Sequence, residues 1–144
     1  MSHNTTVQTK LTSKTNLMKA LTEMGIAHQT GEGLQTKSTY RSAPPVKADI
    51  TFKTTNGDTV GFALNEKEGT YQCVGDFYSG IKTKYKNGDT EFLEQQKFVN
   101  RITQMSAAVK VKDAIRKRYG IKSVKYQLKR DTGKIHIKIV PRKI

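Results

Sequence analysis

The sequence offers few of the residues that build disulfides, metal sites or membrane spans. Cys73 is its only cysteine among 144 residues, which excludes an internal disulfide and a cysteine-based zinc site and favours a reducing compartment. No apolar run approaches the roughly 18 residues of a membrane-spanning helix, and the N-terminal segment MSHNTTVQTKLTSK lacks the apolar core of a secretory signal. We therefore expect a protein of the cytoplasm or an equivalent reducing space, with no membrane among its partners.

Acidic residues are also scarce, and most of the imbalance lies at one end of the chain. The whole sequence has 26 Lys and Arg against 12 Asp and Glu, for a net charge of +14. Residues 109–144 hold 13 of these basic residues but only two acids, Asp113 and Asp131, so that this last quarter carries +11. A segment this one-sided normally faces a polyanion.

The hydrophobic pattern predicts a single α+β domain over residues 1–144, with an antiparallel sheet and two main helices. The expected order is a strand, a helix, a three-stranded meander, a long helix and a closing hairpin. Ser13 is the expected cap of the first helix, whose apolar stripe is Leu17, Leu21 and Met24. Alternating segments on either side of Asn56-Gly57, and again after Gly69, predict the meander.

Two loops and a long helix complete the expected order. Glycine, proline and hydroxyl residues predict a loop over residues 31–47, and a second loop is expected over residues 78–89. In the second loop aromatic side chains beside lysines could stack bases while the cations hold phosphates, which makes its candidate contacts Lys82, Lys84, Tyr85 and Lys86. Asp89 or Thr90 is the expected cap of the long helix, which either runs through Ser106–Ala108 or breaks there, and ends at Gly120.

The basic segment, residues 109–144, reads as a helix end followed by a β-hairpin that turns at Asp131-Thr132-Gly133. The expected register pairs Leu128 with Ile137 and sets Lys129 beside His136, so that one face is apolar and the other cationic. Like charges facing one another destabilise a sheet by roughly 0.2–1 kcal/mol per pair, and phosphates would offset that cost. The candidate nucleic-acid contacts are Lys110, Lys112, Arg116, Lys117, Lys125, Lys129, Lys134, His136 and Lys138.

These residues favour a non-enzymatic binding module for RNA, DNA or a nucleoprotein. The same charge would suit an adaptor that docks on an acidic protein, which is the main alternative. A third reading is a metal-independent nuclease that uses His136 with Tyr126 and nearby lysines. The histidines lie in different predicted elements without metal-ligand spacing, so we expect no metal, no cofactor and no catalytic residue.

Several short motifs follow one another along the chain: the opening Met1-Ser2-His3, the segment Gln8–Leu11, LMKALTEMG, GDTVGFALN followed by YQCVGDF, FVNRITQ and DTGKIHIKI. In their order and spacing these motifs resemble the Ycf35 family, also called DUF1257, of plastid, cyanobacterial and other bacterial genomes. The resemblance implies a small α+β domain with no assigned catalytic residues, in a bacterium, a plastid or a phage-infected host. The lack of tryptophan, the extra loop Gly31–Pro45 and the basic C-terminal segment depart from the family pattern and suggest a divergent member, for which a phage is a candidate source.

Overall fold

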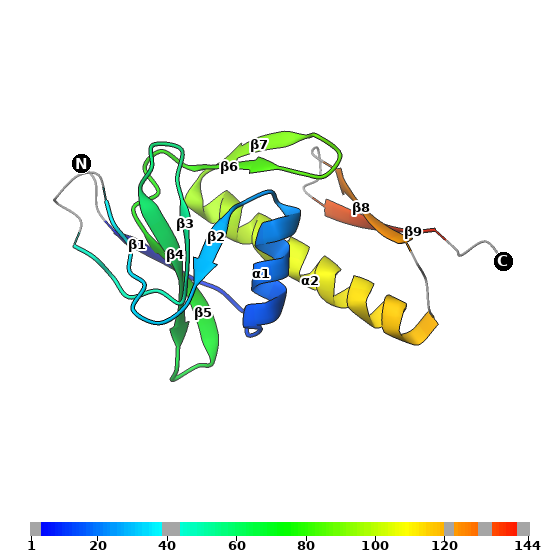
Figure 1. The fold of residues 1–144 in the computed structure, drawn as a ribbon, viewed down its shortest axis with the longest axis horizontal. Helices are drawn as coiled ribbons and strands as arrows, with labels where there is room; N and C mark the ends of the chain where they lie inside the picture. Colours follow the sequence, from blue (N-terminus) through cyan, green and yellow to red (C-terminus); the bar gives the residue numbers. More distant parts are fainter. Residues whose placement is uncertain (1–3, 39–43, 120–122, 130–133, 141–144) are drawn as a thin grey trace.

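The computed structural model of the chain describes residues 4–38, 44–119, 123–129 and 134–140, with side chains in the last two segments for residues 135–137 only. The described residues form a five-stranded antiparallel sheet, two helices on one face of that sheet, and two separate β-hairpins (Figure 1). The fold is therefore the α+β domain that the sequence predicted, with the expected elements in the expected order and, in addition, one short strand and one hairpin.

The five-stranded sheet has the strand order β1-β5-β4-β3-β2, with antiparallel neighbours throughout. β3, β4 and β5 form the predicted meander, in which Phe62 lies opposite both Ile50 and Cys73. All three side chains are buried, so the alternation in the sequence identified the face that meets the core. The strands are β1 (Thr5–Gln8), β2 (His28–Thr30), β3 (Ile50–Lys53), β4 (Thr59–Asn65) and β5 (Thr70–Gly75).

The predicted first helix is α1 (Lys14–Glu23). The Ser13 hydroxyl oxygen accepts a hydrogen bond from the Asn16 backbone N–H at 3.2 Å and so caps the helix. Past its C-terminal end, Gly25 has a φ of +71°, and a Cβ at that position would lie 2.0 Å from the carbonyl oxygen of Lys84. Glycine therefore permits both the turn and the close approach of this segment to Lys84.

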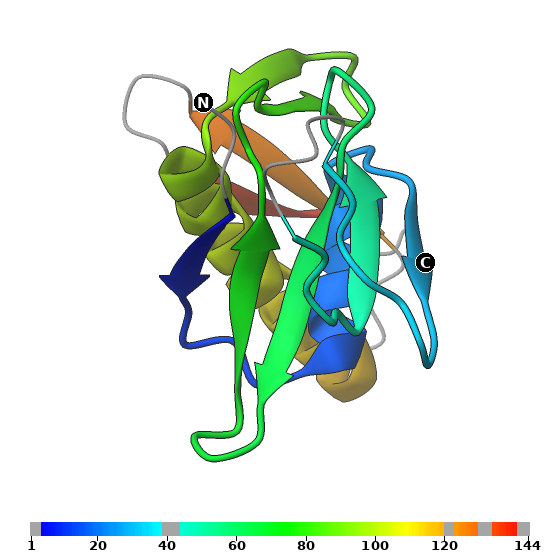
Figure 2. The ribbon, with the colours of Figure 1, turned by 90° about the vertical axis from the view of Figure 1, so that its left-hand side faces the viewer.

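The long helix is α2 (Gln95–Tyr119), which lies on the same face of the sheet as α1 and extends beyond it (Figures 1 and 2). Phe98 packs against Phe52 and Phe62 of the sheet, with ring centroids 5.3 and 5.9 Å apart. The helix is uninterrupted at Ser106–Ala108, where the small side chains of Ser106 and Ala108 are buried in tertiary packing. The helix end is described as far as Tyr119, immediately before Gly120.

A hairpin occupies much of the segment that we expected to be a loop, residues 78–89, and the predicted start of the long helix. β6 (Ile81–Lys84) pairs with β7 (Thr90–Leu93), so the expected helix cap at Asp89 or Thr90 is wrong. The sequence could not reveal this strand. Leu93 is buried in β7, as it would also be in a helix, and the four residues of β7 are too few for their hydrophobic periodicity to distinguish a strand from a helical turn.

The closing hairpin is regular, whereas the described part of the 31–47 segment is not. β8 (Ser123–Lys129) and β9 (Lys134–Val140) form the predicted closing hairpin, and β9 lies against α2, where Ile135 packs on the core. The described residues of the 31–47 segment contain no helix or named strand. Isolated bridges join Gln35 to Lys47 and Lys37 to Thr59.

Candidate nucleic-acid interface

The basic end of α2 presents its cations on two sides of the helix. Lys110 and Lys117 are exposed on one side, whereas Lys112 and Arg116 lie roughly a third of a turn away, where the helix faces α1. Arg116 and Lys117 are in the last turn, where positive charge also stabilises the C-terminal end of a helix dipole. Part of this charge therefore has a structural role, and the four candidate residues do not form one continuous face.

A cavity of about 470 Å³, which we call the α1–α2 niche, brings together charges from distant parts of the sequence. Lys86, from the loop that joins β6 to β7, lies 2.9 Å from Glu23 of α1, and Lys112 of α2 lies 3.8 Å from the same carboxylate oxygen. Lys19 and Asp113 form a third ion pair at 2.7 Å. Thus Lys86 and Lys112, which the sequence assigned to separate contact groups, share one acidic partner.

Cations outnumber acids in the α1–α2 niche. Lys19, Lys86, Lys112 and Arg116 line it, against Glu23 and Asp113. The Lys112 side chain is only 12% exposed, and this burial lowers the pKa of its ammonium group; Glu23 opposes the shift, whereas the nearby charges of Arg116 and Lys86 add to it. The niche is therefore electropositive, because its two carboxylates neutralise only part of the charge of its four basic side chains.

The β8–β9 hairpin has the predicted faces but not the predicted register. Leu128 lies opposite Ile135 instead of Ile137, and Gln127 instead of Lys129 lies opposite His136. A shift of two residues keeps every residue on its face, so the hydrophobic pattern could not distinguish the two registers. His136 is exposed between the half-buried Ile135 and Ile137, as the alternation predicted.

The observed register sets lysine opposite lysine twice. Lys125 is the cross-strand partner of Lys138, and Lys129 is the partner of Lys134, with the Gln127–His136 pair between them. All six positions share the face that carries the exposed His136. The face of the hairpin that turns away from α2 therefore has four lysine positions, one histidine and no acidic position within the described strands.

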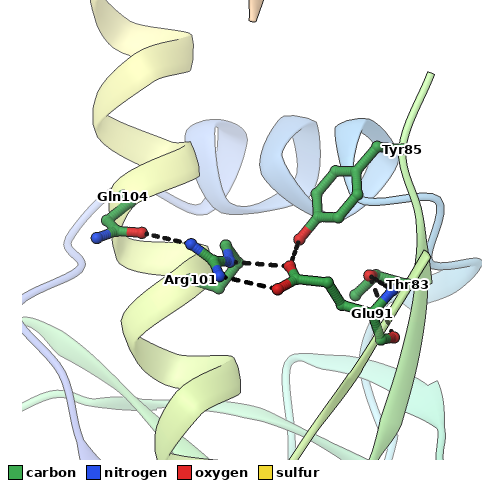
Figure 3. A network of polar contacts seen from close by, with 5 residues as sticks. All are labelled: Thr83, Tyr85, Glu91, Arg101 and Gln104. Atoms are coloured by element: carbon green, nitrogen blue, oxygen red, sulfur yellow. Dashed lines mark hydrogen bonds and ion pairs between the residues drawn. The ribbon is translucent and has the colours of Figure 1, made fainter. Parts of the chain in front are cut away.

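Tyr85 is not available for base stacking, which corrects the prediction for the 78–89 segment. Its side chain is buried, and its hydroxyl donates a 2.5 Å hydrogen bond to Glu91 Oε1. Arg101 of α2 donates to both oxygens of the same carboxylate, at 3.0 Å from Nε and 2.9 Å from Nη2, and its Nη1 donates to Gln104 (Figure 3). This network clamps the β6–β7 hairpin to α2 and directs Tyr85 inward because its hydroxyl has an acceptor there.

The lysines of the β6–β7 hairpin have different surroundings. Lys82 and Lys84 are exposed on its outer face, whereas Lys86 pairs with Glu23 in the α1–α2 niche. The aromatic residue on the outer face is Phe92, which lies opposite Lys82 and is 62% exposed. Sequence reasoning missed Phe92 because it placed this residue in a helix.

Comparison with known proteins identifies the family of the chain. The family model DUF1257, described as a protein of unknown function, matches residues 20–137, from the end of α1 into β9. The chain belongs to the DUF1257 family. No curated protein and no solved structure matches it. The family thus agrees with the resemblance in the sequence motifs.

Cys73 of this DUF1257 chain is placed as a core residue. Its side chain is fully buried, and burial raises the pKa of the thiol well above its ordinary value, although Gln95 partly opposes the shift. A buried, protonated thiol is a poor nucleophile. Cys73 therefore does not supply a reactive group to the basic surface.

The described part of this DUF1257 chain contains no candidate for a metal site or a membrane-spanning helix. No three His, Cys, Asp or Glu side chains there are grouped so that they could hold a metal ion. Among the described helices, none has both the length and the hydropathy that crossing a bilayer requires.

Proposed function

We propose that this DUF1257 chain is a non-enzymatic binding module that contacts RNA, DNA or a nucleoprotein through the end of α2 and the β8–β9 hairpin. The observation that carries the proposal is the pair of lysine–lysine partners in the hairpin, Lys125 with Lys138 and Lys129 with Lys134. Such pairs destabilise a sheet by roughly 0.2–1 kcal/mol each when no counter-charge is present. A phosphate backbone along this face would supply the counter-charge. Stabilisation of the end of α2 would not explain these lysines, because they lie in strands.

The α1–α2 niche supports the same proposal with cations from α2 and from the loop that joins β6 to β7. It adds Lys86, Lys112 and Arg116 to the basic surface, and each can donate hydrogen bonds to phosphate oxygens. Both hairpins lie on the same side of α2 (Figures 1 and 2). A polyanion that follows the β8–β9 hairpin would therefore have further cations beside it. We also propose a reducing compartment, because the only cysteine is a free thiol.

Reversing the charge on one strand of the hairpin tests this function. In the Lys125→Glu/Lys129→Glu variant, both new acids would face the lysines of β9 and form opposite-charge pairs. We expect this variant to unfold at the same temperature as the wild type or higher, and to bind RNA and duplex DNA at least a hundredfold more weakly at 50 mM salt. Fluorescence anisotropy measures the binding and circular dichroism the unfolding.

The matched control variant changes the net charge of the protein by the same amount, but at two positions outside the basic segment. Lys67 and Lys97 are exposed and lie outside the basic segment, so Lys67→Glu/Lys97→Glu should weaken binding less than tenfold. Equal loss in the two variants would mean that binding follows net charge and not this surface. No binding of the wild type to either nucleic acid at 50 mM salt would reject the function and favour the acidic-protein adaptor.

A further inference from the structure

The outer face of the β6–β7 hairpin has the composition of a surface that contacts unpaired bases. The register pairs Lys82 with Phe92 and Lys84 with Thr90, and all four residues are exposed. Glu91, the acid in β7, lies on the opposite face, where its carboxylate binds Arg101. This outer face therefore combines one aromatic ring with two lysines and contains no acidic side chain.

Phe92 is exposed but its ring has a fixed support. A Cβ at Gly80 would come within 2.8 Å of Phe92 Cζ, so the edge of the ring lies directly over the Gly80 backbone. Because Gly80 has no side chain, the ring can rest there while 62% of the residue stays open to solvent. A ring that is already held in place loses little conformational entropy when a base stacks on it.

Lys82 and Lys84 are well placed to contact the phosphate backbone of a single-stranded nucleic acid when one of its bases stacks on Phe92. Direct cross-strand partners have Cβ atoms about 4.5–5.5 Å apart, and residues two apart on a strand are separated by about 6.6 Å. The ammonium groups of both lysines can therefore reach phosphates next to the stacked nucleotide. Proteins that bind single strands use this combination of cations and aromatic faces.

We propose that this outer face is a base-stacking surface for single-stranded nucleic acid, in which Phe92 stacks on a base and Lys82 and Lys84 contact the adjoining phosphates. The inference rests on the proposed function, since it names the form of nucleic acid that the basic module takes. Duplex bases are already stacked on one another and cannot reach Phe92. The protein therefore binds a single strand through Phe92 in addition to its lysines, and a duplex through the lysines alone.

The test compares Phe92→Ala with wild type on two probes, a 15-nucleotide oligothymidine and a duplex of the same length, at 50 mM salt. Loss of one base–aromatic stack should weaken single-strand binding about tenfold, within the range measured for such stacks. Duplex binding should change less than twofold. Leu64→Ala is the control, because Leu64 is also an exposed apolar strand residue but lies on β4; its binding to both probes should equal that of wild type.

Phe92→Trp gives a direct optical readout, because the natural chain contains no tryptophan. This variant should bind oligothymidine at least as tightly as wild type, and its fluorescence should be quenched in proportion to single-strand occupancy but not by the duplex. Two results would overturn the stacking surface and leave the proposed function intact. One is that Phe92→Ala binds oligothymidine as tightly as wild type; the other is that the tryptophan emission of Phe92→Trp is unchanged when the protein is saturated with oligothymidine. Failure of wild type to bind either probe would overturn both.

Discussion

Replacing Glu91 by glutamine would test how the β6–β7 hairpin is fixed to α2. The Glu91 carboxylate accepts two hydrogen bonds from Arg101 and one from the Tyr85 hydroxyl (Figure 3). A glutamine has nearly the same shape but no charge, so the guanidinium of Arg101 would lose its anionic partner. The hairpin that carries Lys82, Lys84 and Phe92 would then be held less firmly.

The expected loss follows from the burial of the pair. Removing one partner of a fully buried ion pair costs about 3–5 kcal/mol. Here the side chains of Arg101 and Glu91 retain 11% and 15% exposure, and Gln104 still accepts a hydrogen bond from Arg101. We therefore expect Glu91→Gln to lower the free energy of unfolding by about 2–3 kcal/mol, which for a domain of this size lowers Tm by roughly 4–12 °C.

Urea denaturation of a double-mutant cycle measures this energy. Adding Arg101→Met removes the stranded charge, so the Glu91→Gln/Arg101→Met variant should recover at least half of the loss. Glu66→Gln removes the same charge from an exposed turn and should change stability by less than about 0.5 kcal/mol. The reasoning fails if Glu91→Gln is as stable as wild type, or if the two substitutions are simply additive.

Three further predictions concern two buried side chains, Cys73 and Tyr85, and the turn glycine Gly25. The buried Cys73 thiol should react with a disulfide reagent only as fast as the protein unfolds; rapid reaction in the native protein would contradict its placement. Burial and the Glu91 hydrogen bond raise the pKa of Tyr85, so the folded state holds the phenolic proton more tightly than the unfolded state. Stability should therefore fall as pH rises above about 10, less steeply in Tyr85→Phe, and equal slopes would refute this. Gly25→Ala should destabilise the protein by at least about 2 kcal/mol because its Cβ meets Lys84, whereas Gly33→Ala, with similar positive φ but open space, should cost about 1 kcal/mol; equal losses would show that only backbone strain matters.

Periodicity in the sequence predicted the elements that bury one face. The Ser13 cap and the apolar stripe of α1, the meander around Phe62, and the outward position of His136 all follow from local patterns with one buried side. Such patterns are reliable because the apolar side chains of one face leave water together, whichever part of the chain covers that face. They determined the fold class and the two faces of the closing hairpin.

Local patterns could not determine features that depend on distant residues. The hairpin β6–β7 was missed because Leu93 is buried in either a strand or a helix, and Tyr85 points inward because Arg101 and Glu91 come together there. The α1–α2 niche joins Lys86 and Lys112 through Glu23, which lies far away in the sequence and carried no signal of its own.

The salt dependence of binding to duplex DNA, measured between 50 and 200 mM, tests the central claim that the basic surface of α2 and the β8–β9 hairpin holds phosphates. With about six phosphate contacts, the affinity should fall about a thousandfold over this range, which corresponds to a slope of about −5 in log K against log salt. The Lys125→Glu/Lys129→Glu variant should show a slope about two units shallower, because two contacts are removed. A slope near zero for the wild type, or the same slope in both proteins, would contradict the claim.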